Sequence, residues 1–421
     1  MATATRTVAE VCESARRASH ELAVASTEAK DAALGRLAEL LENRTAEILE
    51  ANADDLADER AAGLTPALRD RLTLDPSRVA AMAAGVRAIA ALPDPVGEAL
   101  DERTLESGLR LRKIRVPLGV VAVVYEARPN VTVDCAALTL KSGNAIVLRG
   151  SSYAARSNAA LAAVVREAVA AAGLPEEAVE LLTSGDRAEL AELATADGLV
   201  DLVIPRGGGG LKEALKSVAT VPVMYAAAGN CHVYVHDDAD LDMARRVAFN
   251  AKVDRPGVCN AAETLLVNVA VADGFLPGIL GDLREAGVEL MGDERSRAAA
   301  GAAEVGEASA EDWDTEYLDM RMAVGVVDSL EDAIAHVNRH GTGHSEAIVT
   351  SSDVAARAFT DGVDAAVVYV NASTRFTDGF EFGMGAEIGN STQKLHARGP
   401  IGLRELTTFK YVVHGDGHIR A

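Results

Sequence analysis

The sequence predicts an α/β protein built on parallel, doubly wound sheets. Its 421 residues are enough for two or three domains of ordinary size. Apolar residues make up 49% of the chain, so a large core can be buried and disorder is not expected. Short apolar runs alternate with helical patterns over residues 120–203 and again over 232–370, and this alternation is typical of parallel sheets.

The first region, residues 5–91, has the apolar spacing of helices. Ala, Leu and Val recur at i, i+3 and i+4 with charges between them, as in residues 32–41. Pro93 and Pro95 end this pattern. Residues 104–116 follow as two candidate strands. Arg and Lys are so frequent there that we expect an exposed hairpin or an edge that pairs with another subunit.

The remaining elements are predicted from apolar runs and their flanking Gly and Pro residues. One helix pattern ends at Gly173-Leu174-Pro175, the expected order for a helix stop. Residues 294–316 are rich in Ala, Gly and Glu, and we expect a mobile surface segment there. The predicted strands are 120–125, 145–148, 179–182, 199–204, 233–235, 264–267 and 367–369, with helices at 131–141, 158–172, 211–218, 239–250, 272–285 and 330–339.

Charge and cysteine content exclude several classes of function. A net charge of −22 argues against nucleic-acid binding, although a local Arg cluster still permits a small anionic substrate. No apolar run approaches the ~18 residues of a membrane span, and the N-terminus has no signal-peptide pattern. The four cysteines lie far apart without a CxxC, which indicates free thiols. We therefore expect a cytoplasmic protein.

Cys259 is the candidate nucleophile. It lies in a loop with Pro256 and Gly257, directly before the apolar strand at 264–267. A loop exposes the thiol, and the backbone N–H groups that follow it favour the thiolate, which attacks activated carbonyls. The alternative is a buried, inert cysteine, which is the more common fate of an isolated one.

Two further segments follow predicted strands and precede predicted helices. The glycine run that begins at Gly207 and Gly208 suits an anion at a helix N-terminus, or is a loop that merely needs positive φ. Arg128 and Asn130 follow the strand at 120–125, at the strand end where open α/β sheets bind ligands. The alternative for this second segment is a turn shaped by Pro129.

A third cluster lies near the C-terminus, where Lys394, His396 and Arg398 form an anion-site candidate or a solvated loop. Three histidines, His336, His340 and His344, have helical spacing. Glycines after His340 should end the helix, and no carboxylate lies at a matching spacing, so we expect no metal site.

These segments, in this order, resemble the glutamyl-phosphate reductases, a family within the aldehyde dehydrogenase superfamily. The similarity runs over nearly the whole chain. The sequences YEARPN at 125–130 and STQKLHARGP at 391–400 are its most specific parts. The other matching segments are 116–124, 131–132, 141–150, 204–211, 255–267 and 369–387.

The resemblance implies an aldehyde-dehydrogenase-like fold with a Rossmann-like cofactor domain, an α/β catalytic domain and a small β arm for oligomerisation. It also implies the reaction, in which NADPH reduces L-glutamyl 5-phosphate to L-glutamate 5-semialdehyde and phosphate in proline biosynthesis. A homo-oligomer and a partner glutamate 5-kinase are expected with it. The implied domains are an NADP-binding domain (1–103 and 117–230), a catalytic domain (231–376) and the arm (104–116 and 400–421).

The resemblance also implies residue roles. Cys259 attacks the acyl phosphate and carries the thioacyl intermediate, with its own N–H and Asn130 or Arg128 as donors to the oxyanion. Lys394, His396 and Arg398 recognise the substrate phosphate or carboxylate. The cofactor-contacting set is Lys141, Arg149, Ser151, Gly207 and Gly208, with Arg149 a candidate for the adenosine-ribose phosphate of NADP(H).

The sequence departs from the family pattern at a few positions. Tyr225 stands where hydrolytic relatives place a general-base Glu, and its loss suits a reductase that must not hydrolyse its thioester. The Ala226–Ala228 run adds methyl groups near the expected nicotinamide channel. Asp254 places a carboxylate near Cys259, where it would oppose the thiolate. Rival functions are another acyl-phosphate or aldehyde substrate, a hydrolytic aldehyde dehydrogenase, and a paralogue that binds nucleotide without turnover.

Overall fold

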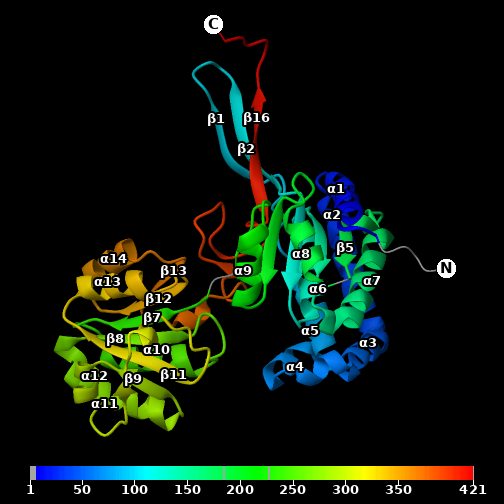
Figure 1. Cartoon of the computed structure of the whole chain (residues 1–421). Coiled ribbons are helices and arrows are strands. Elements are labelled where there is room, and N and C mark those ends of the chain that lie inside the picture. Colours follow the sequence, from blue (N-terminus) through cyan, green and yellow to red (C-terminus); the bar gives the residue numbers. More distant parts are fainter. Residues whose placement is uncertain (1–5, 184, 226–227, 421) are drawn as a thin grey trace. The chain divides into compact units, whose positions relative to one another are not determined.

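The computed structural model describes residues 6–183, 185–225 and 228–420. The chain divides into two compact units (Figure 1). Unit 1 is Met1–Tyr225 with Gly383–Gly389 and Ile401–Ala421, and unit 2 is Ala226–Phe382 with Asn390–Pro400.

Helices fill the N-terminal part of unit 1, as predicted. The first is capped by Thr7, whose side chain accepts from the N–H of Glu10 while the Glu10 carboxylate accepts from the N–H of Thr7. The helices are α1 (Val8–Leu22), α2 (Thr27–Asn43), α3 (Thr45–Ala57), α4 (Pro66–Leu72) and α5 (Pro76–Ala90), with a 3-10 turn at Glu59–Gly63.

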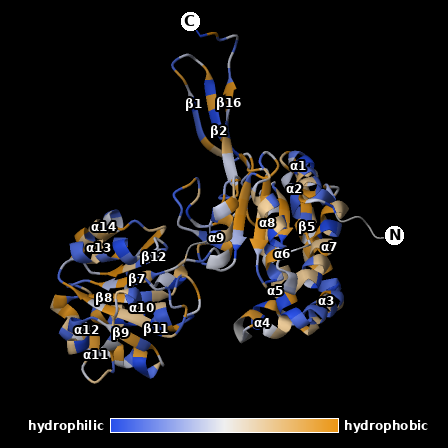
Figure 2. Cartoon of the chain, viewed as in Figure 1, coloured by the Kyte–Doolittle hydropathy of each residue, from blue (hydrophilic) through white to orange (hydrophobic). Residues whose placement is uncertain are grey.

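A four-stranded parallel sheet follows, in the order β5-β4-β3-β6. All residues of β3 and β4 are buried, which explains why their sequences are apolar up to Arg149 at the end of β4. The strands of this sheet are largely orange in Figure 2. The strands are β3 (Val120–Tyr125), β4 (Ala145–Arg149), β5 (Val179–Leu182) and β6 (Leu202–Arg206), and the helices are α6 (Asn130–Lys141), α7 (Ala155–Ala171), α8 (Arg187–Ala194) and α9 (Gly209–Val218).

Two elements in this region begin three residues away from their predicted starts. β6 begins at Leu202 and not at 199, because Asp201 is held in a turn by bonds of its N–H and carboxylate to the backbone of Val120. α7 begins at Ala155 and not at 158, because a carboxylate from another helix caps it.

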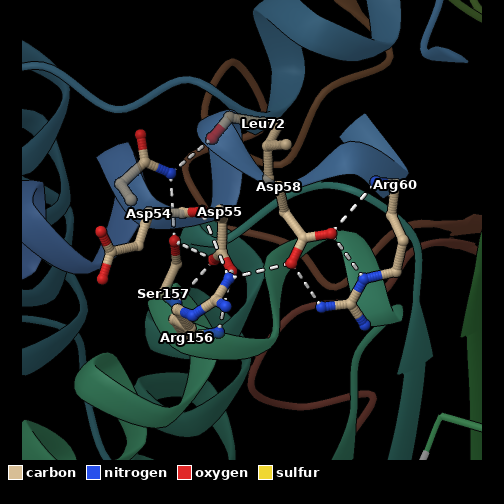
Figure 3. A network of polar contacts seen from close by, with 8 residues as sticks. Asp54, Asp55, Asp58, Arg60, Leu72, Arg156 and Ser157 are labelled. Atoms are coloured by element: carbon tan, nitrogen blue, oxygen red, sulfur yellow. Dashed lines mark hydrogen bonds and ion pairs between the residues drawn. The ribbon is translucent and has the colours of Figure 1, made fainter. Parts of the chain in front are cut away.

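That cap is Asp55 of α3, which is 1% exposed. Its carboxylate accepts from the backbone N–H groups of Arg156 (3.1 Å) and Ser157 (2.8 Å) and from the Ser157 hydroxyl (2.6 Å). Asn52, one turn earlier, donates to Ser157 Oγ and to the carbonyl of Leu72. This polar network ties α3 to the start of α7 and to the end of α4 (Figure 3).

An antiparallel sheet of three strands, the arm, completes unit 1. It consists of β1 (Ala99–Thr104), β2 (Arg110–Pro117) and β16 (Thr407–His414), with β2 in the centre. The prediction that 104–116 holds both hairpin strands is wrong, because residues 105–109 form the turn, with Gly108 at φ +85°. Hydrophilic and hydrophobic residues mix along the arm (Figure 2), and Phe409, Tyr411 and Val413 of β16 are exposed.

Unit 2 is a doubly wound sheet of seven parallel strands in the order β10-β9-β11-β8-β7-β12-β13. Val233 and Val235 pack with α10 (Leu241–Val253) and α11 (Val269–Glu285) on one face. Tyr234 packs with α13 (Leu330–His340) and α14 (Asp353–Gly362) on the other. The strands are β7 (Cys231–Val235), β8 (Ala262–Asn268), β9 (Glu289–Gly292), β10 (Gly306–Glu307), β11 (Arg321–Val327), β12 (Ser345–Val349) and β13 (Val367–Val370).

The helices of unit 2 include two that were not predicted, α12 and α14. Residues 294–316, predicted as a mobile surface segment, form α12, β10 and a 3-10 turn. The helices are α10 (Leu241–Val253), α11 (Val269–Glu285), α12 (Glu294–Ala299), α13 (Leu330–His340) and α14 (Asp353–Gly362), and a short ladder joins β14 (Asn390–Ser391) to β15 (Gly399–Pro400). Across the described part of the chain, no helix has the length and apolar character needed to cross a membrane.

We expect Asp55→Ala to lower the free energy of unfolding by about 2–4 kcal/mol, because it leaves the buried N–H of Ser157 and the part-buried N–H of Arg156 without this acceptor at the start of α7. Asp54→Ala is the matched control, since Asp54 is exposed and joins the network only through its backbone carbonyl. Urea unfolding followed by circular dichroism measures both. Equal shifts in the two variants would contradict the capping role.

Candidate active site

The candidate nucleophile lies on a loop of unit 2 that we call the nucleophile loop, residues 254–261. It connects α10 to β8, and a turn closed by the bond from Ala261 N–H to the carbonyl of Val258 (3.0 Å) precedes the strand. Cys259 lies in this turn and is partly exposed. The position agrees with the predicted exposed cysteine in a loop.

The other three cysteines are buried. Burial raises the pKa of Cys12 to about 11 and that of Cys135 to about 12, and it raises the pKa of Cys231 well above its usual range. Thiols in such surroundings stay protonated and inert at neutral pH. Among the four thiols, Cys259 is therefore the one suited to react.

The peptide group of Cys259 is held closely by the segment before β7. Gly229 lies so close that a Cβ atom there would overlap the Cys259 carbonyl, so only glycine fits. The thiol of Cys231 donates to the same carbonyl over 3.2 Å. The N–H of Gly229 in turn donates to Glu316 Oε1 over 2.6 Å.

The other side of the nucleophile loop is braced by residues 374–377. The amide of Asn260 donates to the carbonyl of Thr377 (2.9 Å), and the Thr374 hydroxyl donates to the carbonyl of Asn260 (2.6 Å). The guanidinium of Arg375 donates to Asn260 Oδ1 and, over 3.1 Å, to Asp254 Oδ2. The carboxylate that we expected to oppose the thiolate is thus neutralised by a cation.

The predicted substrate-binding cluster belongs to the same unit. Lys394 and Arg398 both form ion pairs with Asp364, over 2.5 Å and 3.1 Å. These two cations hold the pKa of Asp364 below its usual range. His396 is exposed between them in the sequence. Lys394 and Arg398 therefore lie together, and both are paired with a carboxylate of the protein itself, that of Asp364.

Unit 1 gathers most of the other predicted residues at one edge of its sheet. Arg128 and Asn130 follow β3, Arg149 ends β4, and Gly207 follows β6. The three strands are parallel and in register, so their carboxyl ends meet at the same edge. The amide of Asn130 donates to Asp134 Oδ2 one turn further along α6 (2.9 Å). Burial raises the pKa of this carboxyl to about 6.

The predicted cofactor residues differ in their surroundings. Arg149 is 8% exposed, and its guanidinium donates to the carbonyl of Asp186 and pairs with Glu189. The hydroxyl of Ser151 is buried, and within the described residues it has no hydrogen-bond partner.

Lys141 is not brought together with the other cofactor residues. It ends α6 at the opposite edge of the sheet, just before β4 begins, and its buried ammonium donates to Asp31 and to the carbonyl of Ala90. The predicted contact of Lys141 with a cofactor therefore has no support from its position.

The glycine run precedes α9, whose cap residue Gly208 makes no side-chain cap. The N–H of Gly208 donates to Glu126 Oε2 over 3.4 Å, so an exposed carboxylate lies where an anion would bind. A Cβ atom at Gly207 would crowd Glu126 and Leu211, whereas Gly208, Gly209 and Gly210 face open space. Ala226 and Ala227, which we expected near the nicotinamide channel, lie outside the described residues.

The histidines with helical spacing do not converge on one point. α13 ends at His340, as predicted, and the Nδ1 of His344 bonds instead to the hydroxyl of Ser345 (2.8 Å). Burial lowers the pKa of His336 to about 3. Among the described residues, the group close enough to share an ion is His236, Asp237 and Asp238, which are consecutive in the sequence. We assign no metal to it.

Several residues that support these sites were missed in the sequence. Glu316 and Arg375 have no local pattern that distinguishes them from surface charges. Glu263 could have been found, because a carboxylate within the apolar run 261–267 must be paired when the strand is buried. Its partner is Lys252.

Comparison with known proteins agrees with the fold. Residues 1–303 match the model of the aldehyde dehydrogenase family. A gamma-glutamyl phosphate reductase of Thermobifida fusca is 54% identical over 415 residues, 99% of each chain, and one of Moorella thermoacetica is 55% identical over 96% of this chain and 97% of its own. A crystal structure of gamma-glutamyl phosphate reductase from Thermotoga maritima matches with a TM-score of 0.96 at 47% identity, covering 99% of this chain and 100% of its own.

The chain therefore belongs to the aldehyde dehydrogenase family and, within it, to the gamma-glutamyl phosphate reductase family. The resemblance and the predicted fold class are both confirmed. The roles of the individual site residues and the predicted domain boundaries stay predictions.

Iodoacetamide at neutral pH should modify Cys259 alone. The other three thiols are buried and have raised pKa values, so little thiolate forms at those positions. Peptide mass mapping locates the label, and Cys259→Ser serves as the control that should take up none. Labelling of Cys12, Cys135 or Cys231 at a comparable rate would contradict this assignment.

Asp134→Asn should stabilise the protein at pH 8 but not near pH 4. Because the folded-state pKa of Asp134 is raised to about 6, the folded state binds this proton more tightly than the unfolded state, and stability is lost as the pH rises through about 6. The amide imitates the protonated form, so the expected gain is about 2–3 kcal/mol above pH 6. Urea unfolding of both proteins across pH measures it, and a difference independent of pH would argue against the raised pKa.

Proposed function

We propose that this chain reduces L-glutamyl 5-phosphate to L-glutamate 5-semialdehyde with release of phosphate, the second step from glutamate to proline. The observation that carries the proposal is the partly exposed Cys259 on a braced loop, in a chain that belongs to the gamma-glutamyl phosphate reductase family. An acyl phosphate is an activated carbonyl compound, and a thiolate is the nucleophile that such a carbonyl accepts most readily.

In the proposed reaction the Cys259 thiolate attacks the acyl carbon, and phosphate leaves with the electron pair of the broken C–O bond. The thioester that remains on Cys259 is then reduced, and collapse of the thiohemiacetal returns the thiolate and frees the aldehyde. The developing oxyanion requires donors. The N–H of Cys259 is one candidate donor, and the family resemblance implies Asn130 or Arg128 as the other.

Tyr225 supports reduction over hydrolysis. It occupies the sequence position at which hydrolytic relatives carry a general-base carboxylate. Burial raises the pKa of the Tyr225 phenol, so this side chain stays protonated at neutral pH and does not activate water. A thioester without a base beside it survives long enough to be reduced.

The family implies a nicotinamide cofactor, and we propose NADP(H) in particular. When bound, it supplies the hydride for reduction of the thioester. Arg149 and the unpartnered Ser151 hydroxyl at the end of β4 suit the adenosine-ribose phosphate. Gly207 and Gly208, which precede α9, are proposed for the pyrophosphate, which would displace the Glu126 carboxylate from the N–H of Gly208. The Glu189 carboxylate already pairs with Arg149, so it competes with a ribose phosphate for this cation. Activity with NADPH and with NADH measures the preference between the two cofactors.

Substrate recognition is proposed for Lys394, His396 and Arg398. Two of these cations are preorganised by Asp364, which keeps them together while leaving Lys394 largely exposed. Phosphate and carboxylate both suit such a group.

Three further expectations belong to this proposal. The arm, with its exposed aromatic residues on β16, suits a homo-oligomer. A glutamate 5-kinase is the candidate partner, because it would supply the labile acyl phosphate. The four cysteines form no disulfide, which suits the reducing cytoplasm.

The reverse reaction tests the proposal with stable reagents. Glutamate 5-semialdehyde, phosphate and NADP should give NADPH absorbance that depends on phosphate. Cys259→Ala should lower the rate on the order of 10³-fold or more, because no other thiol of the chain is suited to replace it. Cys12→Ala, at a buried thiol of α1, is the matched control and should keep the rate.

Two other outcomes favour the rival functions. NADPH formation that does not need phosphate would indicate a hydrolytic aldehyde dehydrogenase. No NADPH at any pH, from folded protein that still binds NADP, would indicate another substrate or a protein without turnover.

A further inference from the structure

A buried ion pair closes the base of the nucleophile loop. Lys252 is near the C-terminal end of α10 and Glu263 is the second residue of β8, so the two residues flank the loop that carries Cys259. Both side chains are 0% exposed, and Lys252 Nζ lies 2.5 Å from Glu263 Oε2.

The same carboxylate also holds a second segment that reaches Cys259. Glu263 Oε1 accepts from the N–H of Leu318 over 3.3 Å, and Leu318 has a φ of +53°, which a leucine adopts only when its surroundings impose it. Two residues earlier, Glu316 accepts from the N–H of Gly229, against which the Cys259 carbonyl packs. The carboxylate of Glu263 therefore links the loop base to the segment that confines the Cys259 peptide.

Stability alone does not explain this pair. Removing two charges from water costs several kcal/mol per ion, and hydrophobic residues of similar volume often stabilise a protein as well or better. Unlike hydrophobic packing, an ion pair is a directional contact, so it fixes where two backbone segments lie relative to each other. Here the two segments are the two ends of the nucleophile loop.

We propose that Lys252 and Glu263 are positioning residues that hold Cys259 in its reactive position, by closing the loop on which it lies and by fixing the 316–318 segment beside it. The inference rests on the proposed role of Cys259 as the nucleophile. Neither side chain contacts the substrate, since both are wholly buried.

The charges around the pair make its strength depend on pH. Burial raises the pKa of Glu263 to about 7, against the opposing effect of Lys252, and the nearby Glu316 raises it further. Burial lowers the pKa of Lys252, while Glu263, Asp319 and Cys231 oppose that change. As the pH falls through about 7, Glu263 gains a proton and the ion pair is lost.

The test compares Glu263→Gln, Lys252→Arg and the double variant Lys252→Met with Glu263→Leu. We expect the double variant to unfold at a urea concentration close to that of the wild type, yet to lose about tenfold or more both in the rate of Cys259 alkylation and in kcat of the reverse reaction. KM should change little. Lys252→Arg keeps the charge and should keep most of both rates. Arg245→Ala breaks an exposed ion pair of the same helix and is the matched control.

Glu263→Gln keeps an oxygen that can accept from Leu318 and removes only the charge, so it decides the question if the double variant does not fold. It should lose the step near pH 7 that we expect in the wild-type profile of kcat. Alkylation and kcat equal to wild type in folded Glu263→Gln or in the folded double variant would overturn the proposal. Alkylation does not depend on the substrate, so a failure of the proposed reaction and a failure of this inference give different results.

Discussion

The close approach of two peptide groups in unit 2 is the constraint on which the candidate site depends. β7 and β8 are parallel neighbours, and Cys231 pairs with Ala262, so the residues that precede the two strands must lie side by side. The space between them admits no Cβ atom at Gly229. The Cys231 thiol bonds to the same Cys259 carbonyl, and Arg375 bonds to the next residue of the loop, Asn260.

Buried charge in this protein is consistently paired, and the pairs lie where elements change direction. Three lysines are essentially fully buried, Lys30, Lys141 and Lys252, and each meets a carboxylate. The first two pairs fix α2, one to the segment after α5 and the other to the end of α6. The buried lysines thus fix one element of the fold to another. The excess of negative charge that gives the chain its net charge of −22 is left for the surface.

The parts of this fold that follow from local chemistry could be predicted from the sequence. β3 and β5 have the predicted bounds, and for β3 the reason is its continuous apolar run, which marks a strand buried on both faces. The start of α7 could not be predicted, since its cap comes from Asp55, about a hundred residues earlier. The same limit applied to the site. Cys259 and the cluster at 394–398 could be recognised by residue type and spacing, whereas the role of Glu316 depends on a partner 87 residues away in the sequence, Gly229. Lys141 is the opposite case, because it lies in a segment that matches the family but its side chain bonds to Asp31 inside the fold.

The arm has a consequence for biosynthesis on the ribosome. Its central strand β2 ends at Pro117, whose partner in β16 is Thr407, about 290 residues later. At roughly 5–20 residues per second, β2 therefore waits about 15–60 s for its second neighbour. During that interval the β1–β2 hairpin presents an unpaired edge to other nascent chains, and the dense Arg and Lys residues of β2 repel the same edge on a neighbouring copy. The charges that give this hairpin its unusual sequence would then protect an unfinished protein as much as they serve the finished one.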